Sequence, residues 1–387
     1  MAHSLVIHVG PRKTGSTFLQ RALAGAAPQL ADAGILYPTR LLGRGRYNHV
    51  SATYSVPGLR NGRSPEIWSR LDESIINDLV AQVVAWDGPV VLSSEALGGM
   101  TSHEARQVLD RLPAVPTHII VTIRALPDVA LSSWSQHVRN LHVPTLDSYL
   151  KRRMGERDGS APEERWTRWD DNPRSTFWRA YDYACLVDRW QRQGLSVTAV
   201  IVPPSSTDPD VLWSRFRQAT GLAGLPEACP TVAESRANRS LGMEELEVLR
   251  NTVLEARERG ITTADLRSLR GHRWKVYLDR SVTTSRPGMT PEQAAQFEAW
   301  AREDLELMTR RDADLIGDPN ELLARARIAQ APEPHAYAVA AGLLVADRVR
   351  AAHARRPPFA RRLRFWRRQL LRLGRRYARS VARRVAP

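Results

Sequence analysis

The first 200 residues of the chain alternate between short, continuously apolar runs and segments in which apolar residues recur every three or four positions. Continuous runs of this length are typical of strands that are buried on both faces of a parallel sheet. Recurrence every three or four positions is typical of the helices that cover such a sheet. Strands that alternate with helices in this way predict a doubly wound α/β fold.

The predicted strands cover residues 5–7, 34–38, 88–95, 117–124 and 195–202. The predicted helices begin at residue 18 and cover residues 66–85, 97–112 and 177–193. The clearest helical stripe is formed by Ile67, Leu71, Ile75, Leu79 and Val83, which are four residues apart. Residues 39–65 are rich in Gly, Arg, Asn and Ser, so we expect them to form a long surface segment.

Two cysteines, Cys185 and Cys229, have no Cys or His neighbour at metal-binding spacing. Neither a disulfide scaffold nor a zinc site is therefore expected, and a reducing cytoplasm fits. No apolar run approaches the ~20 residues that a membrane-spanning helix needs. The N-terminus also lacks the pattern of a signal peptide, so we expect a cytoplasmic protein.

The net charge of +15 is concentrated at the C-terminus. Residues 348–387 hold 15 arginines and no Asp or Glu, and the rest of the chain has 41 basic and 41 acidic residues. The charge therefore predicts no cationic groove on the body of the protein. We predict one domain over residues 1–330 and a helical, Arg-rich extension over residues 331–387.

Apolar residues in this extension recur every three or four positions from Phe359 to Val385, and arginines fill the positions between them. A helix with one apolar and one basic face is typical of a helix that lies on anionic lipid. The same stripe also fits docking on the protein's own body, whereas nucleic acid is a less favoured partner. We expect residues 357–387 to bind an anionic membrane surface and to hold the protein at the inner face of the membrane.

The segment from Leu5 to Arg21, LVIHVGPRKTGSTFLQR, contains the candidate chemistry. A strand, a glycine-containing loop and the start of a helix follow one another, which is the context of a phosphate-binding loop. Loops that bind and hydrolyse nucleoside triphosphates read G-x-x-x-x-G-K-[ST]. Gly10 and Gly15 keep that spacing, but Ser16 stands where the lysine belongs, and the lysine is Lys13.

This arrangement resembles the 5′-phosphosulfate loop of the sulfotransferases that use 3′-phosphoadenosine 5′-phosphosulfate (PAPS), which reads roughly P-x-K-[ST]-G-[ST]-[ST]. The matching residues are Pro11, Lys13, Thr14, Gly15, Ser16 and Thr17. The resemblance implies that this loop, Arg12 included, binds the nucleotide. It also implies that Lys13 neutralises charge on the leaving oxygens, assisted by loop N–H groups and by the hydroxyls of Thr14, Ser16 and Thr17.

A second segment resembles the 3′-phosphate motif of the same family. Arg124 ends a predicted strand, and Ser132 follows eight residues later, early in the next helix. In the family, this Arg and Ser bind the 3′-phosphate that distinguishes PAPS from ordinary adenine nucleotides. A guanidinium can grip a phosphate through two hydrogen bonds, and a hydroxyl near a helix N-terminus adds a donor. The likeness spans about residues 4–325, without the R-K-G-x-x-G-D-W-K segment of the animal cytosolic enzymes.

In-line sulfuryl transfer requires a base that takes the acceptor's proton. In cytosolic relatives this base is a histidine at the end of the strand that corresponds to residues 90–95, where this chain has Glu95. Because glycan-modifying relatives use a glutamate, Glu95 is the first candidate base and His49 is the second. No metal is expected, because this scheme does not need one and no carboxylate cluster suits Mg²⁺.

Trp166, Trp169 and Trp178 lie in a polar stretch over residues 142–180. They fit an acceptor-binding lid and local packing equally well.

These features predict a three-layer P-loop-type α/β fold with a central parallel sheet, and a PAPS-dependent sulfotransferase that releases PAP (adenosine 3′,5′-bisphosphate). A glycan, a lipid-linked sugar and a secondary metabolite all remain open as the acceptor, and the oligomeric state is not indicated. One alternative is a P-loop small-molecule kinase, which Ser16 and the Arg124–Ser132 pair disfavour. Another is a membrane- or polyanion-binding adaptor with a degenerate nucleotide fold, which Lys13 and Arg124 disfavour.

Overall fold

The structure is a computed structural model. It describes residues 1–39, 47–59, 72–157, 159–171, 176–204, 207–230, 241–258, 260, 266, 285–323 and 326–329. The chain divides into two compact units. The first consists of Met1–Trp134, Thr145–Ser240 and Pro287–Ala331, and the second of Ser135–Pro144, Leu241–Arg286 and Pro332–Pro387. The predicted extension over residues 331–387, with its membrane-binding segment, lies outside the described residues.

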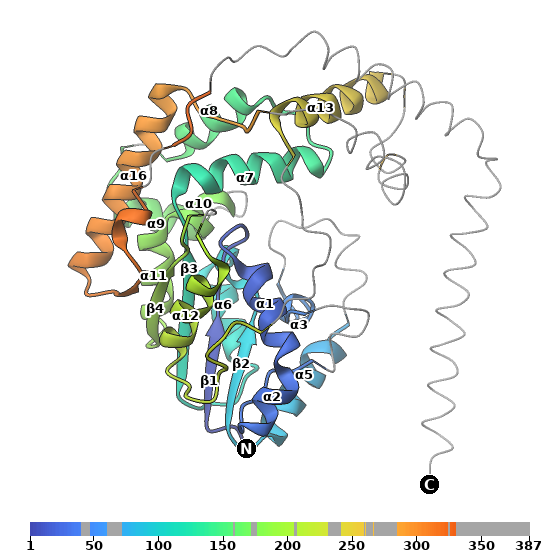
Figure 1. Cartoon of the computed structure of the whole chain (residues 1–387), viewed down its shortest axis with the longest axis vertical. Helices are drawn as coiled ribbons and strands as arrows, with labels where there is room; N and C mark the ends of the chain where they lie inside the picture. The colour runs from blue at the N-terminus through green and yellow to red at the C-terminus, as the bar shows by residue number, and fades with distance from the viewer. Residues whose placement is uncertain are drawn as a thin grey trace, which may run out of the picture. The chain divides into compact units, whose positions relative to one another are not determined.

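The first unit contains a parallel sheet with the strand order β2-β1-β3-β4-β5 (Figure 1). Its strands are β1 (Ser4–His8), β2 (Pro89–Ser93), β3 (Thr117–Ile123), β4 (Ser196–Ile201) and β5 (Asp314–Ile316). All four strand pairs run parallel. β1 to β4 are buried almost throughout, which is the reason for their continuous apolar runs. The predicted α/β fold with a central parallel sheet is confirmed.

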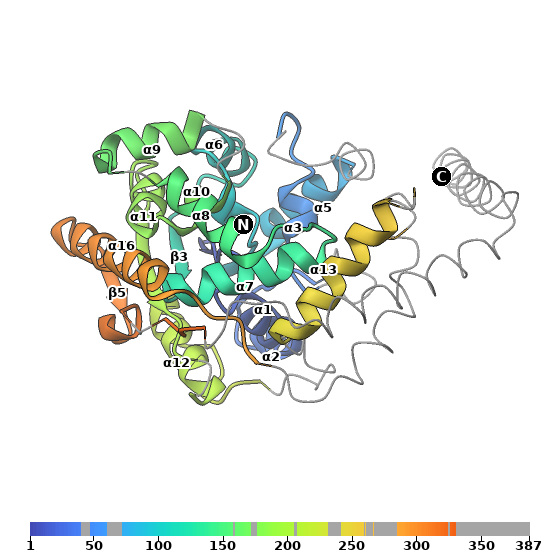
Figure 2. The same ribbon diagram turned by 90° about the horizontal axis from the view of Figure 1, so that it is seen from above.

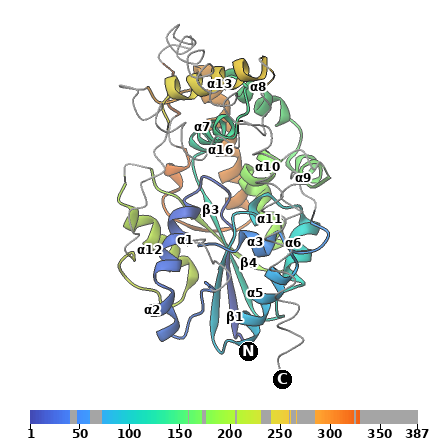
Figure 3. The same cartoon turned by 90° about the vertical axis from the view of Figure 1, so that its right-hand side faces the viewer.

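Helices cover both faces of this sheet (Figure 3). One face carries α1 (Ser16–Gly25), α2 (Ala27–Asp32) and α12 (Pro209–Thr220). Their apolar side chains pack on Val6, Val91, Ile120 and Val200 of four neighbouring strands. The other face carries α3 (Val50–Thr53), α5 (Ser74–Ala85), α6 (Ser102–Leu109) and α11 (Tyr183–Gln191).

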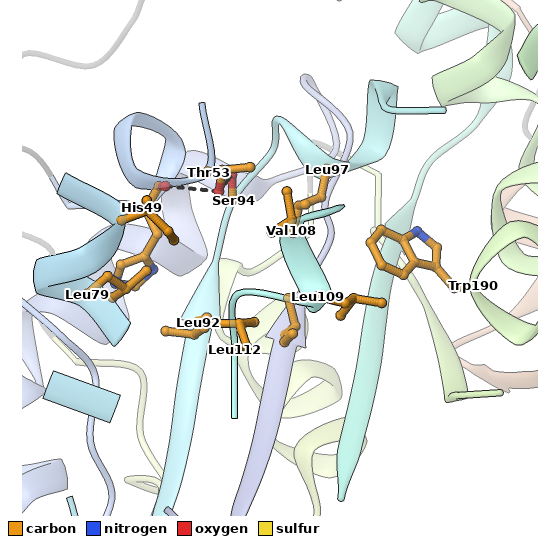
Figure 4. A pocket seen from close by; sticks show the side chains of 12 residues that line it. His49, Thr53, Leu79, Leu92, Ser94, Leu97, Val108, Leu109, Leu112 and Trp190 are labelled. Atoms are coloured by element: carbon orange, nitrogen blue, oxygen red, sulfur yellow. Dashed lines mark hydrogen bonds between the residues drawn. The ribbon is translucent and has the colours of Figure 1, made fainter. Parts of the chain in front are cut away.

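A small cavity of about 20 Å³ lies on this second face, between Ile7 and Leu92 of the sheet and the helices above them. Figure 4 shows that its wall is mainly leucine side chains, with Trp190 on one side and the Thr53–Ser94 hydrogen bond on the other. A space of this size holds about one water molecule. Its described lining residues include none from the loop at 10–17 or from residues 124–132, so the candidate site lies elsewhere.

Buried ion pairs and aromatic rings hold together a further layer of helices. These are α8 (Leu146–Glu156), α9 (Pro162–Asp171), α10 (Thr176–Tyr181) and α16 (Pro291–Arg310). Just after α8, the Arg157 guanidinium donates to Asp304 on α16 through a bond of 2.6 Å. It lies 5.1 Å from the Trp178 ring and 5.5 Å from the Trp300 ring. Burial raises the pKa of Asp304 to about 7, against the opposing effect of Arg157. This pair therefore fixes α16 against the helices that precede β4.

The predicted helix over residues 177–193 is broken at Asp182. This residue is the N-cap of α11, with φ −79° and ψ 92°, and its side chain accepts a hydrogen bond from the Cys185 N–H at 3.1 Å. Aspartate is among the preferred N-cap residues, so the break has a local cause. It places Tyr181 at the end of one helix and Tyr183 at the start of the next.

Other boundaries also differ from the predictions. Residues 34–38 form only a bridge between Leu36 and Val90, because Pro38 has no N–H with which to extend a ladder. The segment predicted as a helix over 97–112 contains η2 (Leu97–Gly99) before α6. Within the predicted helix 66–85, residues 72–85 are described and the helix α5 covers Ser74–Ala85. The edge strand β5, which is followed by η3 (Pro319–Glu321), was not predicted, because its three residues include the polar Asp314.

The second unit contains the last part of α7 (Leu126–Arg139) and α13 (Met243–Glu258) among its described residues. Arg250 and Arg257 of α13 donate to the backbone carbonyls of Val143 at 3.4 Å and Leu141 at 3.0 Å. The two bonds hold α13 beside the segment that follows α7. No helix among the described residues has the length and apolar character needed to cross a membrane.

Candidate functional site

The loop over residues 10–17 joins the carboxyl end of β1 to α1, at the sheet edge that faces the viewer in Figure 2. Gly15 is the N-cap of α1, with φ +77° and no capping side chain. A Cβ on Gly15 would lie 2.6 Å from Leu212 Cδ2, and one on Gly10 would lie 2.5 Å from Ser16 Oγ. Close packing therefore requires glycine at position 10, and the positive φ favours glycine at position 15. The N-terminus of α1 has no side-chain cap for its first N–H groups.

Three hydroxyl groups hold the carbonyls of the loop. The bonds run from Ser16 Oγ to the oxygens of Gly10 (3.2 Å) and Pro11 (3.0 Å), from Thr14 Oγ1 to that of Pro11 (2.6 Å), and from Tyr181 Oη to that of Arg12 (2.7 Å). In a trans peptide the C=O and the following N–H point in opposite directions, and the described chain has no cis peptide. The N–H groups of Arg12 and Lys13 therefore point away from these hydroxyls.

Lys13 has φ +72°, a left-handed conformation that is uncommon for a residue other than glycine. A left-handed residue in a loop that leads into a helix N-terminus turns successive N–H groups toward one side, which is the geometry of an anion-binding nest. The Lys13 side chain is half-buried, and Arg12 and Thr17 are exposed. The loop thus has the backbone form of a phosphate-binding site.

The Thr14 and Ser16 hydroxyls do not point where the prediction that they assist at the leaving oxygens requires. Thr14 is fully buried and Ser16 is buried, and both hydroxyls point to carbonyls within the loop. These two hydroxyls therefore shape the backbone of the loop. Thr17, on the first turn of α1, keeps the exposed hydroxyl.

A buried polar network lies under the loop and was not found in the sequence. His8 on β1 hydrogen-bonds with Ser93 Oγ of β2 at 2.8 Å and with Thr122 Oγ1 of β3 at 3.2 Å. Thr122 hydrogen-bonds in turn with Thr14 Oγ1 at 2.8 Å. Burial lowers the pKa of His8 to about 3, so the ring is neutral at physiological pH. The network joins three strand ends to the loop without any charge.

Arg124 follows β3 and lies beside the loop. Its Nη1 donates to the Lys13 carbonyl at 3.4 Å, and its Nη2 donates to Asp128 Oδ2 at 2.8 Å. Asp128 and Ser132 lie four residues apart on α7 and so share one face of that helix, and Arg124 lies just before the helix begins. Ser132 is half-buried. The structure thus brings Arg124 to the 10–17 loop as predicted, and adds a carboxylate partner that the prediction did not include.

Glu95 follows β2 on the opposite side of the loop and is half-buried. Its Oε2 accepts a hydrogen bond of 2.7 Å from Gln20 Nε2 of α1. The Gln20 side chain is fully buried, and its Oε1 accepts from Asn48 Nδ2 at 3.3 Å. A Cβ on the nearby Gly98 would lie 3.0 Å from Pro11 Cα, which shows how closely this strand end approaches the loop. The carboxylate is therefore held next to the loop by an amide, without a counter-charge among these contacts.

His49 is buried, which differs from the expected surface position. Its Nε2 lies 2.9 Å from the Pro38 carbonyl, and its Nδ1 accepts from the Ser93 N–H at 2.9 Å. Burial lowers the pKa of His49 to about 4. Since both ring nitrogens bind backbone groups, His49 joins β2 to the Pro38 segment. The ring therefore has a structural role in these contacts.

The three tryptophans of residues 142–180 are core residues. Trp166 is 6% exposed, Trp169 1% and Trp178 0%, and the Trp178 Nε1 donates to the Arg153 carbonyl at 2.8 Å. Local packing, one of the two predicted interpretations, therefore accounts for them. No group of three or more His, Cys, Asp and Glu side chains suited to a metal ion occurs within the described ranges.

The carboxyl ends of β2, β1 and β3 thus bring Glu95, the 10–17 loop and Arg124 together, as the sequence predicted. The residues that hold them, Gln20, Asp128, Tyr181 and Tyr183, were not predicted. Asp128 lies four residues from Ser132 on α7 and Gln20 lies three residues from Thr17 on α1, which was a usable signal on a helix. The two tyrosines lie about 50 residues or more from either motif and carried no such signal.

No protein-family model and no curated protein sequence matches the chain. Among solved structures, it is similar to a sulfotransferase from Alicyclobacillus acidocaldarius, with 16% sequence identity and a TM-score of 0.39. The match covers 73% of this chain and 97% of the other. Neither value establishes a family.

Proposed function

We propose that the protein is a PAPS-dependent sulfotransferase that moves a sulfuryl group to a hydroxyl or amine of its acceptor. The observation that carries the proposal is the contact between the two candidate anion-binding segments, in which the Arg124 guanidinium reaches the Lys13 carbonyl of the loop at 3.4 Å. One ligand can therefore touch both segments. A nucleotide with a 5′-phosphosulfate and a 3′-phosphate has two anionic groups for these two positions.

In this mechanism the loop N–H groups and Lys13 bind the phosphate to which the sulfuryl group is attached. The acceptor oxygen attacks the sulfur in line, and the bond between the sulfur and the bridging oxygen breaks. PAP leaves with the electron pair, and its growing negative charge is stabilised by Lys13 and the helix N-terminus. The acceptor's proton passes to Glu95, which Gln20 holds in place.

The alternative of a P-loop kinase is less well supported by the loop. Ser16 occupies the position of the kinase lysine, and its hydroxyl points to the carbonyls of Gly10 and Pro11. The loop therefore lacks a basic residue at position 16, where the kinase loop has its lysine. A glycan, a lipid-linked sugar and a secondary metabolite remain candidate acceptors.

Calorimetry with PAP and ADP tests the proposal directly. We expect the wild type to prefer PAP, and Arg124→Ala to lose about ten- to a hundredfold in PAP affinity, the range for hydrogen bonds to a charged group. ADP affinity should change little. Arg106→Ala is the matched control, because Arg106 forms an i,i+4 pair with Asp110 away from the loop.

Equal affinities of the wild type for PAP and ADP would refute the proposal, and tight binding of Mg·ATP would favour the kinase. The acceptor can be sought by incubating the protein with labelled PAPS and a cell extract. Running the reaction with and without the membrane fraction separates a lipid-linked acceptor from a soluble one.

A further inference from the structure

Two buried tyrosines reach the two anion-binding segments from one short piece of chain. Tyr181 Oη donates to the carbonyl of Arg12 in the loop at 2.7 Å. Tyr183 Oη donates to the carbonyl of Arg124 at 2.6 Å and accepts from the N–H of Arg124 at 3.1 Å. The side chains are 6% and 2% exposed, and burial raises the pKa of both phenols, so they remain protonated donors.

Tyr181 also contacts the helix that follows Arg124. The Ser133 side chain, on α7, lies close enough to the Tyr181 hydroxyl to oppose the rise in its pKa. One phenol therefore bonds to the loop after β1 and lies beside the helix after β3. The direct contact from Arg124 Nη1 to the Lys13 carbonyl is longer, at 3.4 Å, and belongs to a flexible side chain. The tyrosines make the shorter and more rigid connection.

The piece of chain between the tyrosines is itself held from several sides. Asp182 caps α11 through the Cys185 N–H and accepts from Trp169 Nε1 at 3.2 Å. The Tyr183 N–H donates to Asp304 Oδ2 at 3.1 Å, and Asp304 is bound to the buried Arg157. Besides their bonds to the two segments, residues 181–183 are thus anchored to α16 and, through Asp304, to Arg157 after α8.

We infer that Tyr181 and Tyr183 are positioning residues that set the distance between the 10–17 loop and the Arg124 segment. A ligand with two anionic groups gains affinity from its second contact only when the spacing of the two sites matches its own. The tyrosines therefore select a nucleotide with two separate phosphate groups over one with a single anionic group. This ligand class rests on the proposed function, but the mechanical connection between the segments does not.

Amide hydrogen exchange without ligand tests the connection. We expect Tyr181→Phe and Tyr183→Phe each to raise exchange in peptides that cover residues 10–17 and also in peptides that cover residues 124–132. The increase should be about tenfold at the nearer segment, as for the loss of one buried hydrogen bond. Tyr37→Phe is the matched control, because it removes a buried phenol that donates to the Tyr47 carbonyl at 2.8 Å and touches neither segment.

Binding of three probes tests the selection. PAP, 5′-AMP and 3′-AMP are titrated into the wild type, both single variants and the double variant. PAP affinity should fall about tenfold in each single variant, whereas either monophosphate should change less than about twofold, since a single anionic group does not sense the spacing. The double variant should lose less than the product of the single losses, because both tyrosines act on one distance.

The outcomes separate the two proposals. If each variant changes exchange at its own segment alone, or at neither, the inference is wrong. Equal losses for PAP and for both monophosphates would also overturn it, because the tyrosines would then merely support the fold. If the wild type shows no preference for PAP over ADP while exchange is coupled across both segments, the proposed function fails and the connection stands.

Discussion

The two charged side chains on either side of the 10–17 loop are held in opposite ways. On the β2 side, the Glu95 carboxylate accepts a hydrogen bond from the neutral amide of Gln20. On the β3 side, the Arg124 guanidinium is paired with the Asp128 carboxylate at 2.8 Å. An amide orients a carboxylate without cancelling its charge, whereas a carboxylate balances a guanidinium until a stronger anion displaces it. In the proposed function, the β2 side would therefore take the proton and the β3 side would recognise the anion.

This contrast predicts that changes on the β2 side alter rate and changes on the β3 side alter affinity. Glu95→Gln should give the largest effect, a loss of ~10²–10⁴ in turnover, which is the usual contribution of a general base. PAP affinity should stay near the wild-type value. Rapid-quench assays with labelled PAPS and calorimetry with PAP measure the two quantities.

Glu292→Gln, on the exposed first turn of α16, is the control for Glu95→Gln. Near-normal turnover of Glu95→Gln would remove Glu95 from the mechanism. If His49→Ala then abolished turnover in a folded protein, the role of the base would pass to His49.

Acid should lower the stability of the folded protein through His49, which contacts β2. An unfolded histidine takes up a proton near pH 6.5, whereas burial keeps the pKa of His49 in the folded protein at about 4. Between these values the unfolded chain binds more protons. The free energy of unfolding should therefore fall as the pH falls, by about 1.4 kcal/mol per pH unit for this residue.

Denaturant unfolding between pH 7 and pH 4.5 measures this slope, and His49→Asn should lack the His49 share. His3→Asn is the control, because His3 is exposed. An NMR titration of His49 gives an independent reading, and proton uptake near pH 6.5 in the folded protein would contradict the prediction.

Gln20→Leu should lower turnover while leaving PAP affinity near the wild-type value. The change removes the N–H donor that orients the Glu95 carboxylate, so we expect a loss of about tenfold in turnover, as for one hydrogen bond to a charged group. Gln193→Leu, which removes a bond to the Ser102 carbonyl, is the control. Unchanged turnover would mean that Gln20 does not position the base.

Asp128→Asn should give the smallest effect, and it should be a gain in PAP affinity rather than a loss. Removing the partner charge frees Arg124 for a phosphate, so PAP should bind about two- to fivefold more tightly, the range for a partly exposed ion pair. The gain should shrink as salt rises from 0.05 to 0.5 M, because salt screens exposed charges. Asp110→Asn serves as the matched control on α6. Weaker PAP binding by Asp128→Asn would show that the carboxylate orients Arg124 for the ligand.

Local patterns in the sequence were enough to predict the fold class and the three candidate strand ends. Apolar runs gave β1 to β4 because strands covered on both faces must be apolar along their length. Gly10 and Gly15 marked the loop, since a side chain at Gly10 would collide with its neighbours and Gly15 has a positive φ. Because parallel strands place their carboxyl ends at one edge, Glu95, Lys13 and Arg124 could be assigned to a common site before the structure was known.

Tertiary packing alone decided what surrounds these residues. His49 was predicted in a surface segment but is buried, because its ring fits between the backbones of Pro38 and Ser93. Tyr181 and Tyr183 reach the loop and Arg124 across 169 and 59 residues of sequence. Such contacts depend on how α10, α11 and α16 pack, and no local spacing encodes them. The candidate site residues could therefore be identified from short segments of sequence. The hydrogen bonds that position them come from residues that meet only in the folded chain.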